Sequence, residues 1–221
     1  MLHASVHPRH TLHRMEFQYS IVADKKLLKP LAEALLSSIL FHRLFGSVTP
    51  DSRELLNITY PHPLLGTAKE NQELAQLLDE NASLLSRSLE NGERADLELP
   101  TCPAELPQAK QTEVAPVGSV PGVVVGETDM TVQFFEKRTK KSTWFGKNDD
   151  KLWEQWRVRI QAVTCRSDVE TEKMRGLVQQ QLQSILMAMA ADVNANKDHI
   201  PPITTVETSP FPYKVVVSKG S

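Results

Sequence analysis

Hydrophobic and polar side chains alternate along two stretches of the chain. Phe17, Tyr19 and Ile21 take every second position near the N-terminus, and Trp156 belongs to a longer alternation further on. A period of two is the pattern of a strand with one buried face and one solvated face. Together with shorter runs of β-favouring residues, this pattern predicts strands over residues 16–22, 55–60, 131–139, 153–163 and 213–217.

The limits of some of these strands follow from their neighbours. Pro61 and Pro63 come directly after 55–60 and are expected to end that strand, because proline has no N–H for the ladder. The strands 131–139 and 153–163 flank a polar segment and are predicted to form a hairpin.

Apolar residues recur at three- and four-residue spacing in three further stretches, which indicates amphipathic helices. The first is expected to begin near Lys29 after a cap at Asp24, because Pro30 is tolerated only in a first turn, and to stop at Gly46. Capping boxes mark the starts of the other two helices, which are expected over the residues that follow Thr67 up to Asn91-Gly92 and over 168–193.

These elements predict an α+β fold, a mostly antiparallel sheet with three helices packed on one face. We expect one domain over 15–217 and a tail over 218–221. Residues 93–129 are rich in proline and glycine and are interpreted as a loop insertion. Residues 1–14 carry several histidines and are interpreted as a disordered leader, with metal binding as the alternative.

Composition narrows the function classes. The 221 residues carry a formal net charge of -2, which argues against a nucleic-acid partner. Cys102 and Cys165 are too few and too far apart for a disulfide framework, so a reducing, cytoplasmic location is expected. No apolar run approaches the ~20 residues that span a bilayer, so we expect no transmembrane segment.

Motifs for catalysis are missing from the sequence. It contains no phosphate-binding glycine loop and no HExxH, CxxC or GxSxG motif. His62 and His199 lie beside prolines without a recognisable nucleophile, and Cys165 is interpreted as a small buried residue. We therefore expect a protein that is not an enzyme, holds no cofactor and acts by binding.

Two adjacent aromatic residues, Trp144 and Phe145, stand in the polar segment between the hairpin strands. Three interpretations are open. The rings fold back onto their own domain, they anchor a partner protein, or they insert into a membrane beside the basic residues Lys140, Lys141 and Lys147. The membrane alternative uses the whole basic aromatic loop over 137–147.

The hairpin segment resembles the Autophagy-related protein 101 family of HORMA-domain proteins. The resemblance is carried by a strand, a basic stretch, the Trp144–Phe145 pair, the acidic turn Asp149-Asp150 and a strand that opens with Trp153-Glu-Gln-Trp156. Three further motifs are similar to the same family, namely Leu40-Phe-His-Arg43, His199-Ile-Pro-Pro202 and Pro210-Phe-Pro-Tyr213. Members of the family place a proline between the two finger rings, whereas Trp144 and Phe145 are adjacent here.

The resemblance implies a HORMA fold whose C-terminal segment is similar to a safety belt. It implies a non-catalytic adaptor subunit of the autophagy-initiation kinase complex, present in the cytoplasm and at the phagophore assembly site. The partner would be the HORMA domain of autophagy-related protein 13, which the subunit binds and stabilises. Trp144 and Phe145 would recruit downstream autophagy factors. By analogy with other HORMA dimers, the outer side of the helix 168–193 is the expected contact face.

Overall fold

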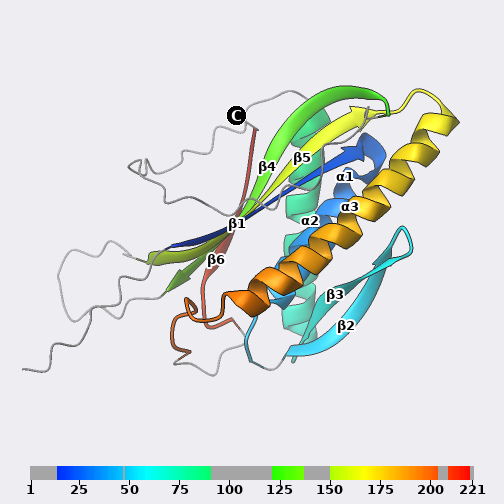
Figure 1. The fold of residues 1–221 in the computed structure, drawn as a ribbon. Helices are drawn as coiled ribbons and strands as arrows, with labels where there is room; N and C mark the ends of the chain where they lie inside the picture. Colours follow the sequence, from blue (N-terminus) through cyan, green and yellow to red (C-terminus); the bar gives the residue numbers. More distant parts are fainter. Residues whose placement is uncertain (1–13, 47, 91–120, 137–149, 204–208, 220–221) are drawn as a thin grey trace, which may run out of the picture.

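Strands and helices segregate into two layers, as the alternation and the helical spacing predict. The computed structural model describes residues 14–46, 48–90, 121–136, 150–203 and 209–219. Within these residues the chain has the predicted α+β architecture, with helices α1, α2 and α3 on one side of a four-stranded sheet (Figure 1).

The main sheet is built from strands that are far apart in the sequence. Its order is β1 (Met15–Asp24), β5 (Lys151–Thr164), β4 (Val123–Glu136) and β6 (Tyr213–Lys219). β4 pairs antiparallel with both β5 and β6, whereas β1 runs parallel to β5. The mostly antiparallel sheet and the hairpin of β4 with β5 are therefore confirmed.

The helices cover the apolar face of this sheet. The short 3-10 helix η1 (Lys25–Leu27) leads into α1 (Leu28–Phe41), and α2 (Ala68–Glu90) and α3 (Asp168–Ala195) follow. α1 contacts α2, α3 packs along β1, and α2 reaches β4. The core between the layers includes fully buried side chains from both layers: Ile21, Leu35, Ile39, Leu85, Trp156, Ile160, Leu182 and Ile185.

The predicted helix signals are found at the helix starts. Asp24 accepts a hydrogen bond from the Lys26 amide and caps η1, and Pro30 falls in the first turn of α1. The side chain of Ser167 caps α3 by accepting from the Glu170 amide. Gly46 does not end α1, which stops at Phe41; its backbone φ of 132° turns the chain toward the next strand.

The prediction of a strand over 55–60 is wrong in its limits. β2 (Val48–Leu55) and β3 (Ile58–Leu65) form an antiparallel hairpin, and Leu56 and Asn57 make its turn with positive φ angles of 52° and 62°. Such φ values are those of the tight turns that match the twist of a hairpin. Residues 55–60 are thus a turn with the ends of two strands.

The two prolines do not end the strand but lie inside β3. Pro63 faces Pro50 and Pro61 faces Ser52 across the hairpin. Residues at these positions direct their N–H groups away from the partner strand, since the amides of Val48 and Leu65, in the same alternation, bond outside the ladder to Gly46 and Asn71. Proline therefore removes no ladder hydrogen bond here.

Two predicted loop boundaries also need correction. The insertion predicted over 93–129 ends earlier, because Val123–Asp129 belong to β4 and pair with β5. The proline and glycine residues of this region indicated a loop, and the first residues of β4 were therefore not predicted as strand. The tail predicted over 218–221 is wrong for Ser218 and Lys219, which pair with Asp129 and Thr128 in β6. Residues 1–13 of the leader predicted over 1–14, and residues 93–120 of the insertion predicted over 93–129, lie outside the described residues.

Candidate functional site

The residues predicted to bind partners lie outside the part of the chain that the structure describes. Trp144, Phe145, Lys140, Lys141 and Lys147 all belong to 137–149. What the structure does describe is the stem that carries this segment. β4 and β5 remain paired up to Glu136 and Lys151, so both ends of the segment leave from one closed hairpin.

The stem is stiffened by aromatic rings. Trp153 is 2% exposed and packs on Phe134 at 6.2 Å and on Phe211 at 4.9 Å between ring centroids. Phe134 also contacts Tyr213 at 6.0 Å. Aromatic pairs at these separations add to the burial of their surface. The segment that precedes β6 therefore packs on the end of the hairpin from which residues 137–149 leave.

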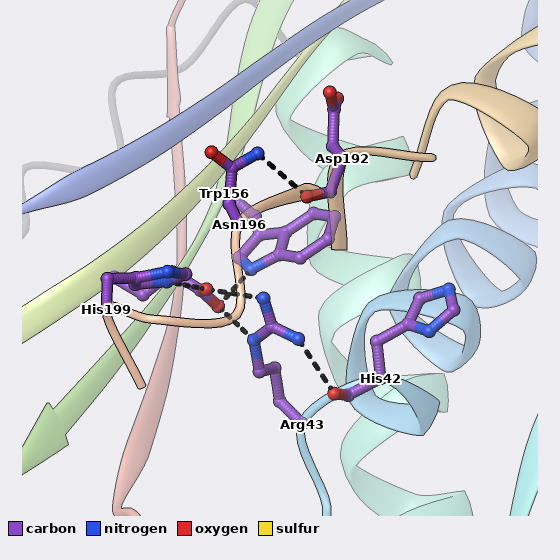
Figure 2. A network of polar contacts seen from close by, with 7 residues as sticks. His42, Arg43, Trp156, Asp192, Asn196 and His199 are labelled. Carbon is purple, nitrogen blue, oxygen red and sulfur yellow. Dashed lines mark hydrogen bonds and ion pairs between the residues drawn. The ribbon is translucent and has the colours of Figure 1, made fainter. Parts of the chain in front are cut away.

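A buried ion pair lies one residue along from Trp153. Glu154 is completely buried, and its two carboxylate oxygens each accept a hydrogen bond of 2.6 Å from Arg43, one from Nε and one from Nη2. His199 donates from Nε2 to the same carboxylate at 2.7 Å, and the indole N–H of Trp156 donates to it as well. Figure 2 shows these donors converging from β5, from the end of α1 and from the segment after α3.

The donors keep this carboxylate charged in the interior. Burial by itself raises the pKa of Glu154, but the hydrogen bonds from His199 and Arg43 outweigh it, and the pKa lies below the usual value. Arg43 in turn is 1% exposed and also donates to the carbonyl of His42 at 2.9 Å. Its guanidinium lies 5.3 Å from the centre of the Trp156 ring. The pair is thus enclosed by protein on all sides.

A neutral histidine and a neutral tyrosine flank the pair. His42 stacks on Trp156 with an interplanar angle of 8°, and burial followed by the charge of Arg43 lowers its pKa to about 4. Tyr19 donates to Asp192 of α3 at 2.8 Å. Burial, and then this hydrogen bond, raises the pKa of Tyr19 above its ordinary value, so it remains a donor.

Four sequence motifs that suggested a family resemblance therefore meet in space. His42 and Arg43 come from the motif Leu40-Phe-His-Arg43, and Trp153, Glu154 and Trp156 come from Trp153-Glu-Gln-Trp156. His199 comes from His199-Ile-Pro-Pro202, and Phe211 and Tyr213 come from Pro210-Phe-Pro-Tyr213. Sequence reasoning did not assign Glu154 a role. The available signal was its position two residues before Trp156, which places an acidic side chain on the buried face of β5.

The described residues offer little for catalysis. No group of three or more His, Cys, Asp or Glu side chains within them could hold a metal ion. Cys165 is half-buried, and burial with a contact to Asp24 raises its pKa to about 11, which leaves it a protonated thiol at neutral pH. No helix in the described ranges is both long enough and apolar enough to pass through a bilayer.

One serine–histidine contact was not foreseen. Ser37 Oγ of α1 lies 2.7 Å from Nδ1 of His62 in β3, a partner for His62 that no motif in the sequence predicts. His62 is 4% exposed, and burial followed by the charge of Arg53 lowers its pKa. Both side chains are sealed between α1 and the hairpin, so this contact attaches β3 to the core.

The outward side of α3 differs from that of α2. Between Arg175 and Asp192 the helix has no charged residue, and its exposed positions there are glycine, alanine, glutamine, serine and Met187, which is 67% exposed. By contrast, α2 exposes Lys69, Glu73 and Asp79. Depletion of charge with an exposed methionine is typical of the centre of a protein–protein interface.

The described residues define an α+β protein whose buried polar network joins the first helix, the central hairpin and the C-terminal segment. The profile of the family described as Autophagy-related protein 101 matches residues 20–207. This match spans most of the chain, and the chain belongs to the Autophagy-related protein 101 family.

A curated relative supports the assignment at lower identity. Autophagy-related protein 101 of Arabidopsis thaliana is 24% identical over 113 residues, which cover 43% of this chain and 52% of the relative. The match thus spans about half the length of that relative. Membership of the family supports a role in autophagy.

Proposed function

We propose that this protein is a non-catalytic adaptor subunit of the autophagy-initiation kinase complex. Its partner is the HORMA domain of autophagy-related protein 13, which it binds and stabilises, and it works in the cytoplasm and at the phagophore assembly site. The chain itself adopts a HORMA fold in this proposal. Family membership and three helices against a mostly antiparallel sheet support it.

The C-terminal segment is the safety-belt-like part of this fold. It leaves α3 at Ala195, contacts Glu154 through His199, packs Phe211 on Trp153 and ends in β6 along β4. Its described parts therefore reach from the helical layer to the far edge of the sheet and are held at His199, at Phe211 and along β6.

The outer face of α3 carries the proposal for heterodimer formation. Its charge-free stretch between Arg175 and Asp192 exposes Met187 and small or amide side chains. Burying such a face against a partner removes apolar area from water without leaving a charge unpaired. A charged residue introduced into this face would lose hydration on binding and weaken the complex.

The variant Met187→Glu tests this contact face. We expect it to weaken binding to the HORMA domain of autophagy-related protein 13 at least tenfold, measured by titration calorimetry. Val169→Glu is a matched control, because Val169 is 65% exposed on the same helix and lies ~27 Å from Met187 along the axis. If Met187→Glu binds as tightly as the parent chain, this face is not the contact.

Recruitment is assigned to the segment that the hairpin stem carries. In this proposal Trp144 and Phe145 bind downstream autophagy factors. The stem supports it because β4 and β5 stay paired to the last described residues and hold both ends of the segment. Tryptophan is enriched among the few residues that carry most of the binding energy of protein interfaces.

The double variant Trp144→Ala with Phe145→Ala tests the recruitment step. We expect folding and heterodimer formation to be unchanged while recruitment of downstream factors is lost in cells. A fall in Tm by many degrees would instead show that the two rings belong to the core of the domain. Lys140→Ser with Lys141→Ser is the companion variant, because it alters the same segment without removing either ring.

A second candidate function is a peripheral membrane module that uses residues 137–147. The five cationic residues of that stretch beside two aromatic rings favour contact with anionic lipid. Flotation with anionic vesicles distinguishes it from recruitment. Lipid binding by the isolated chain, lost when Lys140 and Lys141 are neutralised, would favour the membrane function.

A further inference from the structure

Met187 differs from the other methionines that the structure describes. It lies on the outward side of α3 and is 67% exposed. Met130, Met174 and Met189 are completely buried in the core, and Met15 is partly buried and packs against the same core. Among the described residues, Met187 is therefore the methionine whose side chain is most accessible to solvent.

The comparison with Met189 is the sharpest, because the two methionines are two residues apart in one helix. Neighbours at this spacing lie on different sides of an α-helix. Met189 points into the core and is 0% exposed, whereas Met187 points away from it. A change confined to the side chain of Met187 therefore leaves the packing between the helices and the sheet unaltered.

The neighbours of Met187 on the helix surface leave its sulfur open to solvent. A long helical side chain lies over the turn N-terminal to its own residue, which here carries Gln183 and Ser184. Both are exposed, and the hydroxyl of Ser184 donates to a backbone carbonyl one turn earlier at 3.0 Å. On the C-terminal side, the exposed Ala190 and Ala191 have no side-chain atom beyond Cβ. Small molecules in water can therefore reach the thioether.

The thioether of methionine is oxidised by hydrogen peroxide. The sulfur attacks one peroxide oxygen, the O–O bond breaks and an S=O bond forms, while the second oxygen leaves as water with both hydrogens. The sulfur loses two electrons and the peroxide gains them, so no further reactant is needed. The product is a polar sulfoxide, and methionine sulfoxide reductases restore the thioether.

The side chain of Met187 stands in the charge-free stretch of α3 between Arg175 and Asp192. A contact with a partner at this place gains from the removal of the apolar thioether from water. The oxygen of a sulfoxide accepts hydrogen bonds from water and would lose them when a partner covers the side chain. Oxidation therefore opposes binding at this face without altering the core.

We propose that Met187 is an oxidation site, and that its conversion to the sulfoxide by peroxide weakens the contact made by the outer face of α3. This inference rests on the heterodimer contact proposed above, because only a covered side chain transmits the change to a partner. Oxidation acts on the free subunit, since the partner shields the sulfur once the complex has formed. Peroxide thereby limits the assembly of new complexes and leaves assembled ones intact.

The first experiment measures selectivity on the full chain without a partner. The chain is treated with hydrogen peroxide and digested, and the sulfoxide at each methionine is followed over time by mass spectrometry of the peptides. We expect Met187 to be oxidised at least tenfold faster than Met130, Met174 and Met189, with an unchanged Tm. If one of these buried methionines reacts as fast as Met187, the oxidation proposal is wrong, and the proposed contact face is unaffected.

The second experiment compares the parent chain with Met187→Leu. Leucine has a similar volume and is apolar but has no sulfur, so this variant retains the contact and resists peroxide. Each chain is treated with peroxide, freed of it and titrated with the HORMA domain of autophagy-related protein 13 by calorimetry. We expect the parent chain to lose affinity at least fivefold and to recover it after incubation with methionine sulfoxide reductases. The affinity of Met187→Leu should not change.

Three results would overturn the proposal, and they separate it from the proposed function. If Met187→Glu weakens binding but the oxidised parent chain binds as tightly as the untreated one, oxidation does not regulate a contact that itself stands. If neither change weakens binding, the outer face of α3 is not the contact and both proposals are wrong. If the parent chain and Met187→Leu lose affinity equally after peroxide treatment, the oxidation that matters lies at another residue.

Discussion

Arg43 and Glu154 face each other inside the protein, 111 residues apart in the sequence, with both carboxylate oxygens 2.6 Å from guanidinium nitrogens. The side chains are 1% and 0% exposed. A buried pair of this kind contributes little net stability compared with apolar residues, yet each partner is indispensable to the other. The pair therefore fixes the end of α1 to β5 in one arrangement.

Removing either partner alone should lower the stability of the protein by more than the intact pair adds to it. We expect Arg43→Met to lower the free energy of unfolding by about 3–5 kcal/mol, because Glu154 would stay buried with fewer donors. Glu154→Gln should cost a similar amount through the unpaired guanidinium. In the double variant the two losses should overlap by about 1–3 kcal/mol, measured by urea denaturation as a double-mutant cycle. Additive losses would show that the two residues act independently.

His199 should matter most for the C-terminal segment. His199→Phe retains a ring near Trp153, whose centroid lies 5.4 Å from that of His199, but loses the hydrogen bond to Glu154. A hydrogen bond to a charged group contributes about 1.5–3 kcal/mol. We expect the amides of β6 to exchange faster than in the parent chain, with a smaller change in α1.

The control for this variant is His62→Phe, which removes a different histidine contact, the one to Ser37. In this variant, backbone amides of the β2–β3 hairpin should exchange hydrogen faster, while those of β6 should exchange at nearly the same rate as in the parent chain. If both variants alter the same amides equally, His199 has no special link to the C-terminal segment.

Two glycines provide a further matched pair. Gly122 has a φ of +97°, and a Cβ there would lie 2.8 Å from the carbonyl oxygen of Thr164. Gly122→Ala should therefore destabilise the start of β4 by about 1–3 kcal/mol. Gly176 is exposed in α3 with nothing within 4 Å of a Cβ, so Gly176→Ala should stabilise the chain by about 0.5–1 kcal/mol. Thermal unfolding should show a lower Tm for Gly122→Ala and a higher Tm for Gly176→Ala than for the parent chain.

Short-range signals explain which parts of the fold could be predicted. The alternation around Tyr19 and Trp156 and the capping boxes at Thr67 and Ser167 depend on a few neighbouring residues, and all four lie in or beside the predicted elements. The β2–β3 hairpin was missed because its turn residues, Leu56 and Asn57, carry no glycine.

The buried network could be anticipated only in part. The position of Glu154 in β5 already implies a buried acidic group, since it shares a face with Trp156. Its donors come from Arg43 and His199, and no local pattern relates positions so distant in the sequence. The hydrogen bond that Gln181 of α3 accepts from the backbone of β1 likewise depends on where the two elements cross and is visible only in three dimensions.

Mild acid should destabilise the protein through His42. Its pKa is about 4 in the folded chain, against an ordinary value of 6.5, because burial and then Arg43 disfavour the charged ring. Between these two pH values the unfolded chain binds more protons than the folded one. The free energy of unfolding therefore falls as the pH drops from about 6.5 toward 4, by up to roughly 3 kcal/mol from this group.

His42→Phe isolates this contribution, because it keeps an aromatic ring beside Trp156 and cannot be protonated. Urea denaturation at several pH values from 7 to 4.5 should show a shallower loss of stability for the variant than for the parent chain. Glu154, whose pKa is lowered, destabilises the fold on protonation only below its ordinary value of 4.5, which is the lower end of this range. If the free energies of unfolding of the variant and the parent chain differ by the same amount at every pH in this range, the fold does not hold His42 neutral.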